Sequence, residues 1–144
     1  MERQQLEWTC SICSLTWVIQ STGIDPAFTR EQGAIALDYP TGVNETYGLT
    51  SIEYMINAFQ SFGLRVGHKW CTFDEAYSIC RNYTGVINPV GMYHFMAIRG
   101  IDGSDIGDIW VANSAPGYRG IYDSISRNSF NQLAPVQLVW LESR

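Results

Sequence analysis

The sequence predicts an α+β domain in which the first half is helical and the second half forms an antiparallel sheet. In the first half, apolar residues recur three or four positions apart, which is the period of a helix with one buried face. From Gly85 onward the pattern changes to short apolar runs separated by turn residues, which is typical of strands. Helices followed by strands within one short chain favour helices packed against an antiparallel sheet.

Four helices are predicted, each with a start signal. Thr9 precedes the first helix as an acceptable N-cap, and Gly23 ends it in the manner of a C′ residue. The other three begin at capping-box sequences: Thr29 to Gln32, Thr50 to Glu53 and Thr72 to Glu75. We expect them to extend to about Leu37, Gly63 and Arg81.

The predicted strands are apolar runs bounded by turn residues, at 64–69, 86–87, 92–101, 109–113 and 136–141. The segment 38–47 is a loop by composition, and 123–133 has room for a turn of helix, which Asn128 and Asn131 weaken. No linker or internal repeat interrupts the chain. We therefore expect residues 1–144 to form a single domain with one core.

Charge and composition exclude several classes of function. A net charge of −5 at pH 7 and nine scattered Lys and Arg argue against a nucleic-acid partner, which needs a basic patch. No run of about eighteen apolar residues is present, so no membrane segment is expected. The polar stretch from Glu2 to Glu7 does not fit a signal peptide. We expect a monomeric protein that is cytoplasmic as synthesised.

Four cysteines, at positions 10, 13, 71 and 80, are too few and too irregular for a disulfide scaffold, so we expect reduced thiols. His68, Cys71 and Cys80 are interpreted as structural residues. No cofactor and no metal is expected.

Cys10 is the candidate nucleophile. At the start of a helix its sulfur lies near free N–H groups and the positive end of the macrodipole, which favours thiolate and predicts a lowered pKa. The backbone N–H of Cys10 is one unpaired donor, and the side-chain amide of Gln4, six residues upstream, could supply a second. Two donors that converge beside a nucleophile form an oxyanion hole.

His94 and Asn113 are predicted to meet across a β-hairpin. Asp102 to Asp105 is a turn signal, and folding the chain about its middle pairs position 99 with 108 and position 94 with 113. Directly opposed residues have Cβ atoms roughly 4.5–5.5 Å apart, which brings the Asn oxygen within reach of an imidazole nitrogen. A slip of one residue would place the two side chains on opposite faces.

Together these residues fit a cysteine hydrolase. Cys10 attacks a carbonyl carbon, His94 takes the thiol proton and later protonates the leaving amine, and Asn113 orients the imidazole. Because Asn carries no negative charge, it stabilises the imidazolium less than an Asp does.

The sequence resembles the papain-like cysteine peptidases, most closely the branch that includes the bacterial leader-processing, double-glycine peptidases. The matching residues lie in order along nearly the whole chain: Gln4, then Cys10 to Trp17, then His94 to Asp102, then Asn113 to Gly117. Two positions depart from that branch. Ser11-Ile12 replaces a Gly-Pro pair and alters how closely substrate backbone can approach, and Asn113 replaces the usual Asp.

The resemblance implies a papain-like fold, with an N-terminal helical half carrying the Cys packed against a C-terminal antiparallel sheet carrying the His. It also implies a peptide substrate. Similar domains occur in phage endolysins, so the resemblance implies a peptidoglycan stem-peptide substrate, and action at the cell wall after release, as one form of this activity. A peptidase of bacterial secretion is the other form.

Three alternatives to a cysteine peptidase stay open. Cys10-x-x-Cys13 resembles a redox motif, although only nine residues precede it. Cys10, Cys13, His68 and Cys71 are ligands of a type that holds structural zinc. Finally, the Ser11-Ile12 departure leaves open an inactive papain-like domain that only binds peptide.

Overall fold

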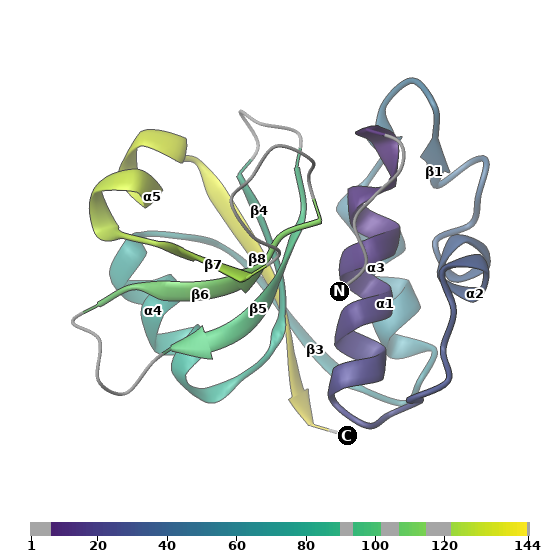
Figure 1. The fold of residues 1–144 in the computed structure, drawn as a ribbon, viewed down its shortest axis with the longest axis horizontal. Coiled ribbons are helices and arrows are strands. Elements are labelled where there is room, and N and C mark those ends of the chain that lie inside the picture. Colours follow the sequence, from purple (N-terminus) through teal and green to yellow (C-terminus); the bar gives the residue numbers. More distant parts are fainter. Residues whose placement is uncertain (1–6, 90–93, 102–106, 115–121, 144) are drawn as a thin grey trace.

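The computed structural model describes residues 7–89, 94–101, 107–114 and 122–143 (Figure 1). A short 3₁₀ helix, η1 (Glu7–Thr9), leads directly into the first of the five α-helices in this part of the chain. These are α1 (Cys10–Ser21), α2 (Arg30–Ala36), α3 (Ile52–Gln60), α4 (Phe73–Asn82) and α5 (Arg127–Leu133).

The described residues contain one large sheet and one small one. The large sheet has six strands in the order β3-β8-β4-β5-β6-β7, and every neighbouring pair is antiparallel. Its strands are β3 (Arg65–Cys71), β4 (Gly85–Pro89), β5 (Met96–Ile101), β6 (Ile109–Ala112), β7 (Tyr122–Ile125) and β8 (Val136–Ser143). The small sheet pairs β1 (Val43–Asn44) with β2 (Gly48–Leu49).

The large sheet separates two cores because successive side chains of a strand point to opposite faces. Val86 and Val139 lie opposite each other and belong to the core formed with α1 and α3. Their sequence neighbours Ile87 and Leu138 belong to the core formed with α4 and α5. Figure 1 shows α1, α2 and α3 together on one side of the molecule and α4 and α5 on the other.

The architecture confirms the predicted fold class: a helical N-terminal half is packed against a mainly C-terminal antiparallel sheet. All four predicted helices are present. The capping boxes at Thr29 and Thr72 are formed, with Gln32 and Glu75 as the reciprocal partners. Gly23 has a φ of 76°, as expected of a residue that ends a helix. In the described residues, none of the helices is long and apolar enough to span a bilayer.

The first helix begins at Cys10 with Thr9 at the N-cap position, as predicted, but the capping bonds of the first and third helices differ from expectation. Thr9 makes no capping hydrogen bond through its side chain, because η1 continues into α1 without the extended residue that an N-cap requires. The third helix is capped by Ser51, which accepts from the N–H of Glu53, and the Thr50-to-Glu53 capping box is not formed.

The strand predictions were less complete. The β1–β2 pair lies partly in a segment predicted to be loop, and two-residue strands are too short for an alternating pattern to be recognised. The segment 123–133 is divided between β7 and α5, with Ser126 as the N-cap of the helix. Strand β5 starts at Met96, later than predicted, and residues 92–93 of that prediction lie outside the described part.

Helix α1 is joined to the residue that precedes β5 by a buried hydrogen bond. The Ser14 hydroxyl donates to the Phe95 carbonyl over 3.2 Å, across 81 positions of sequence. Ser11, three residues earlier on the same helix, is also fully buried, yet its hydroxyl has no hydrogen-bond partner among the described residues. The two serines are therefore a matched pair in which one hydroxyl connects the helix to the sheet and the other does not.

We expect Ser14→Ala to lower the free energy of unfolding by about 1–3 kcal/mol, because it removes the donor of a buried hydrogen bond. Ser11→Ala, as the control, should change it by less than about 0.5 kcal/mol or raise it, since that hydroxyl is buried without a partner. Urea unfolding of the two variants measures both. Equal losses from the two substitutions would contradict a specific role for the Ser14 bond.

Candidate active site

Cys10 is the first residue of α1 and is buried, with 4% of its surface exposed. The backbone N–H groups of Cys10 and Ser11 lie near its sulfur, because the first N–H groups of a helix have no partner inside the helix. A third N–H, from Phe95 at the approach to β5, also faces the thiol. The sulfur thus sits where the helix start meets the residue that follows His94.

The electrostatics of Cys10 differ from the prediction. Burial raises the pKa of its thiol above the ordinary value, and the N–H groups of Phe95, Ser11 and Cys10 lower that pKa by less than burial raises it. The predicted lowering of the Cys10 pKa is therefore wrong for the protein without substrate. The helix start does favour thiolate, but removing the sulfur from water disfavours it more strongly.

His94 and Asn113 are joined by a hydrogen bond. The imidazole Nε2–H donates to the Asn113 side-chain oxygen over 2.7 Å, and the two residues are 8% and 1% exposed. Burial lowers the pKa of His94, which the Asn113 bond offsets only in part. With its hydrogen on Nε2, neutral His94 keeps a lone pair on Nδ1, so that nitrogen is the one able to accept a proton.

The strand register that brings these two residues together is not the predicted one. Ala97 pairs with Ala112 and Ile98 with Val111, so each partner lies two positions later in the sequence than predicted. Beyond a bulge between Ile98 and Gly100, toward the turn, the partners lie three positions later than predicted. At the end of the hairpin near His94 the shift is two, which keeps the side chains there on their predicted face, because the period of a strand is two. His94 and Asn113 therefore meet diagonally instead of directly across.

A cavity of about 460 Å³ opens onto Cys10. On one side it is lined by residues 45–52, which carry β2 and the start of α3, and by Trp8 of η1. On the other side lie three residues of the sheet region: Asn88, Phe95 and Gln137. The cavity is thus a cleft between the helical half and the sheet, with the candidate nucleophile in its wall.

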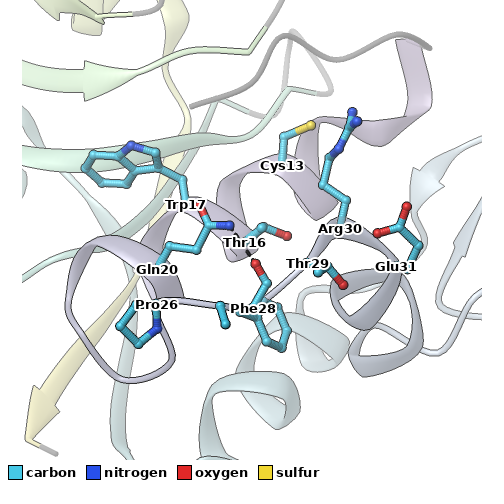
Figure 2. Close-up of a pocket in the computed structure, with 10 residues that line it drawn as sticks. Cys13, Thr16, Trp17, Gln20, Pro26, Phe28, Thr29, Arg30 and Glu31 are labelled. Atoms are coloured by element: carbon cyan, nitrogen blue, oxygen red, sulfur yellow. Dashed lines mark hydrogen bonds between the residues drawn. The ribbon is translucent and has the colours of Figure 1, made fainter.

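Cys13 lies in a different cavity, of about 310 Å³, between α1 and the segment that leads into α2. Figure 2 shows the Arg30 guanidinium beside the Cys13 sulfur, and the Gln20 amide that bonds the Phe28 carbonyl over 2.6 Å. Burial raises the pKa of Cys13, and Arg30 lowers it by less. Because this cavity does not contain Cys10, we assign the candidate site to the cleft.

The remaining candidate residues are Gln4 and the four residues of the zinc interpretation. Gln4 lies outside the described residues. His68 and Cys71 are on β3, at the edge of the sheet, whereas Cys10 and Cys13 are on α1. Within the described part of the chain, no three His, Cys, Asp or Glu side chains are grouped so that they could hold a metal ion. The zinc interpretation is therefore wrong. All four cysteines lie in the described residues and are unpaired.

The sequence analysis missed Asn88 and Gln137, which line the cleft and are buried. A signal for them exists. Asn88 directly follows the apolar pair Val86-Ile87, and Gln137 interrupts the run Val136 to Leu141, so each is a polar residue within a strand that is otherwise apolar. A buried polar side chain needs partners, and in a strand beside a candidate nucleophile it indicates a site.

Comparison with known proteins gives a match among solved structures. No family model matches the chain, and no curated protein matches it. The structure is similar to the crystal structure of a double glycine motif protease from an AMS/PCAT transporter in complex with the leader peptide. The TM-score is 0.65 at 14% sequence identity, over 96% of this chain and 88% of the other. The fold is that of the papain-like peptidases.

The raised pKa of Cys10 and the lowered pKa of His94 predict a neutral pair near pH 7. The absorbance difference near 240 nm between the protein and its Cys10→Ser variant should show no thiolate below about pH 8.5, the pKa of an ordinary thiol. Thiolate already present at about pH 5–6 would instead indicate an ion pair with His94 in the resting protein.

The lowered pKa of His94 also predicts a loss of stability in acid. The folded-state pKa lies below the ordinary value of 6.5, so neutral His94 contributes stability above about pH 6.5, which is lost as the pH falls toward the folded-state pKa. The loss approaches about 1.4 kcal/mol per pH unit. Urea unfolding at pH 7.5 and pH 5 measures it. In His94→Gln this component should vanish; an unchanged pH dependence would contradict it.

Proposed function

We propose that this chain is a cysteine peptidase that hydrolyses a peptide bond through Cys10, His94 and Asn113. The observation that carries the proposal is that a histidine–asparagine hydrogen bond, a buried thiol and a cleft lie together. The His94–Asn113 hydrogen bond lies one residue from the backbone N–H that faces the Cys10 thiol, and a cleft opens onto that thiol. The papain-like fold supports the same assignment of nucleophile and base.

In the proposed reaction, the Cys10 sulfur attacks the substrate carbonyl carbon while His94 Nδ1 takes the thiol proton. The tetrahedral intermediate collapses to a thioester as His94 returns the proton to the leaving amine. Water then attacks the thioester carbon, His94 takes a proton from that water, and Cys10 leaves as a thiol. Asn113 keeps a hydrogen on Nε2 throughout, so Nδ1 is the nitrogen that takes and returns the proton at each step.

Burial determines how charge is handled in this scheme. Because both partners are neutral at rest, attack and proton transfer occur together, and the site does not carry a separated ion pair before substrate binds. The charge that develops is on the substrate oxygen. The backbone N–H of Cys10 is one donor for it, and we propose the side-chain amide of Gln4 as the second.

The departure at Ser11-Ile12 does not weigh against activity. Both side chains are buried, and neither lines the cleft that contains Cys10. A substrate in the cleft therefore meets Cys10 without meeting the residues that replace the family's Gly-Pro pair. This favours an active peptidase over a domain that only binds peptide.

We propose a peptide as substrate, lying in the cleft between residues 45–52 and the sheet. The structural relative was crystallised with a leader peptide, which supports a peptide chain as the occupant. The resemblance in sequence to endolysin domains supports a peptidoglycan stem peptide. Both substrates present an amide bond to Cys10. They differ in the residues that precede and follow that bond.

The test is hydrolysis of two substrates, an unbiased mixture of synthetic peptides and purified peptidoglycan, each followed by mass spectrometry of the products. We expect new termini from one of them, with no activity in Cys10→Ala and a loss of about 10²–10⁴-fold in His94→Ala. Asn113→Ala should cause a smaller loss, because it removes the orienting group and leaves the base.

Cys13→Ser is the matched control, since it alters a buried thiol of the same helix that lies in the other cavity. Its activity should stay within about twofold of the unmodified protein, as for a residue away from the chemistry. Hydrolysis that survives Cys10→Ala but is lost in Cys13→Ser would identify Cys13 as the nucleophile and contradict the proposal. Binding without hydrolysis of either substrate would favour the inactive alternative.

A further inference from the structure

A chain of three hydrogen bonds crosses the sheet and ends on the backbone of His94. His68 Nε2 bonds the Gln137 side-chain oxygen over 2.9 Å, and the Gln137 amide nitrogen donates to the Asn88 oxygen over 2.8 Å. The Asn88 amide nitrogen then donates to the carbonyl oxygen of His94 over 2.8 Å. The chain thus begins on edge strand β3, passes through β8 and β4, and reaches the residue that carries the proposed base.

The strand register aligns these side chains. Asn88 lies directly opposite Gln137 in the β4–β8 pair, and Gln137 lies opposite Trp70, two residues from His68 on the same face of β3. Val86 and Val139, each two positions away along their strands, belong to the core under α1. The chain therefore lies on the α1 side of the sheet, where the cleft is.

The direction of every bond in the chain is determined from its end. The His94 carbonyl can only accept, so Asn88 must present its nitrogen there and its oxygen to Gln137. Gln137 must then present its nitrogen to Asn88 and its oxygen to His68, and His68 must donate from Nε2. Neither amide can rotate by half a turn without losing two hydrogen bonds, so a donor at position 68 holds the whole chain in one orientation.

Burying the two amides of this hydrogen-bonded chain, Asn88 and Gln137, carries a desolvation cost that the apolar residues at neighbouring positions avoid. Asn88 and Gln137 are 6% and 8% exposed, and burying an amide is unfavourable unless its hydrogen bonds are made. The adjacent cross-strand pair on the same face, Val86 with Val139, fills its place with apolar side chains. The stability of the sheet alone does not call for two amides here. Both of them line the cleft that contains Cys10.

The group that receives the chain is the peptide unit between His94 and Phe95. Its carbonyl accepts from Asn88, and its N–H faces the Cys10 thiol. Because a trans peptide unit is planar, with its C=O and N–H pointing in opposite directions, fixing the carbonyl also aims the N–H. The same unit carries the Cα of His94, so its rotation would turn the imidazole away from Asn113.

We propose that His68, Gln137 and Asn88 are positioning residues of the peptidase proposed above, and that they fix the His94–Phe95 peptide unit relative to the Cys10 sulfur. The inference rests on that proposed function and adds to it a residue on the edge strand that does not touch the cleft. His68 acts through the two amides, and Asn88 acts on the base directly. Position 68 therefore needs a hydrogen-bond donor, not a histidine as such.

The test compares His68→Leu, which has no donor, with His68→Gln, whose amide nitrogen can donate to Gln137. Lys69→Leu is the matched control, because it is the next residue of β3, points to the opposite face and takes no part in the chain. For each protein, kcat and KM are measured on whichever substrate the unmodified protein hydrolyses, together with the rate at which iodoacetamide modifies Cys10. Urea unfolding gives the fraction folded under assay conditions.

We expect His68→Leu to lower kcat about 3–10-fold with KM within twofold, since misplacement of a reacting group by a fraction of an ångström has effects of this size. His68→Gln should recover the unmodified kcat within about twofold, and Lys69→Leu should not lower it. Asn88→Ala, which removes the contact to the His94 carbonyl, should lower kcat by about 10–100-fold. The rate at which iodoacetamide modifies Cys10 should rank the variants in the same order as kcat does.

Three outcomes overturn the proposal. If His68→Leu and His68→Gln have equal kcat, the donor at position 68 is irrelevant to the site. If the fraction folded falls while the kcat of the folded protein does not, the chain is structural only. If either result is found while the unmodified protein shows hydrolysis that depends on Cys10, the proposed function stands and only the positioning role is removed. An absence of Cys10-dependent hydrolysis overturns both.

Discussion

The contact between the start of α1 and the approach to β5 is the constraint on which the site depends. Ser14 bonds the Phe95 carbonyl, and the Phe95 N–H faces the Cys10 thiol, so two adjacent peptide units of the sheet region are held by one helix. These residues lie more than 80 positions apart in sequence. Without this contact, Cys10 and His94 would belong to separate halves of the molecule, and neither half contains both a candidate nucleophile and a candidate base.

The same contact places the site in a dry environment, which sets its chemistry. Removing Cys10 and His94 from water raises the pKa of the thiol and lowers that of the imidazole, and both shifts favour the neutral forms. The nearby N–H groups oppose this for the thiol but do not overcome it. In the proposed peptidase, Cys10 stays protonated until a substrate carbonyl is in place. Its reactivity then depends on orientation more than on a permanent thiolate.

The prediction of the His94–Asn113 contact shows how a local pattern can succeed with an incorrect register. The predicted turn, Asp102 to Asp105, lies outside the described residues, but the pairing that it implied is two residues away from the observed one at the end of the hairpin near the site. Because side chains alternate with a period of two, such a shift preserves the face. A signal for the bulge between Ile98 and Gly100 exists, because Gly100 follows Arg99 and an isolated glycine within a strand pattern often marks a bulge.

The sequence by itself determined the fold class, four of the five helices described and the residue types that could act as nucleophile, base and orienting group, because periodicity, capping residues and side-chain chemistry are local properties. Only the tertiary structure decided the protonation of Cys10 and the place of His68, Gln137 and Asn88. A pKa depends on how much water the folded chain excludes, and burial of Cys10 involves β5 as well as its own helix. Likewise, His68, Gln137 and Asn88 lie far apart in sequence and become neighbours only when β8 is inserted between β3 and β4.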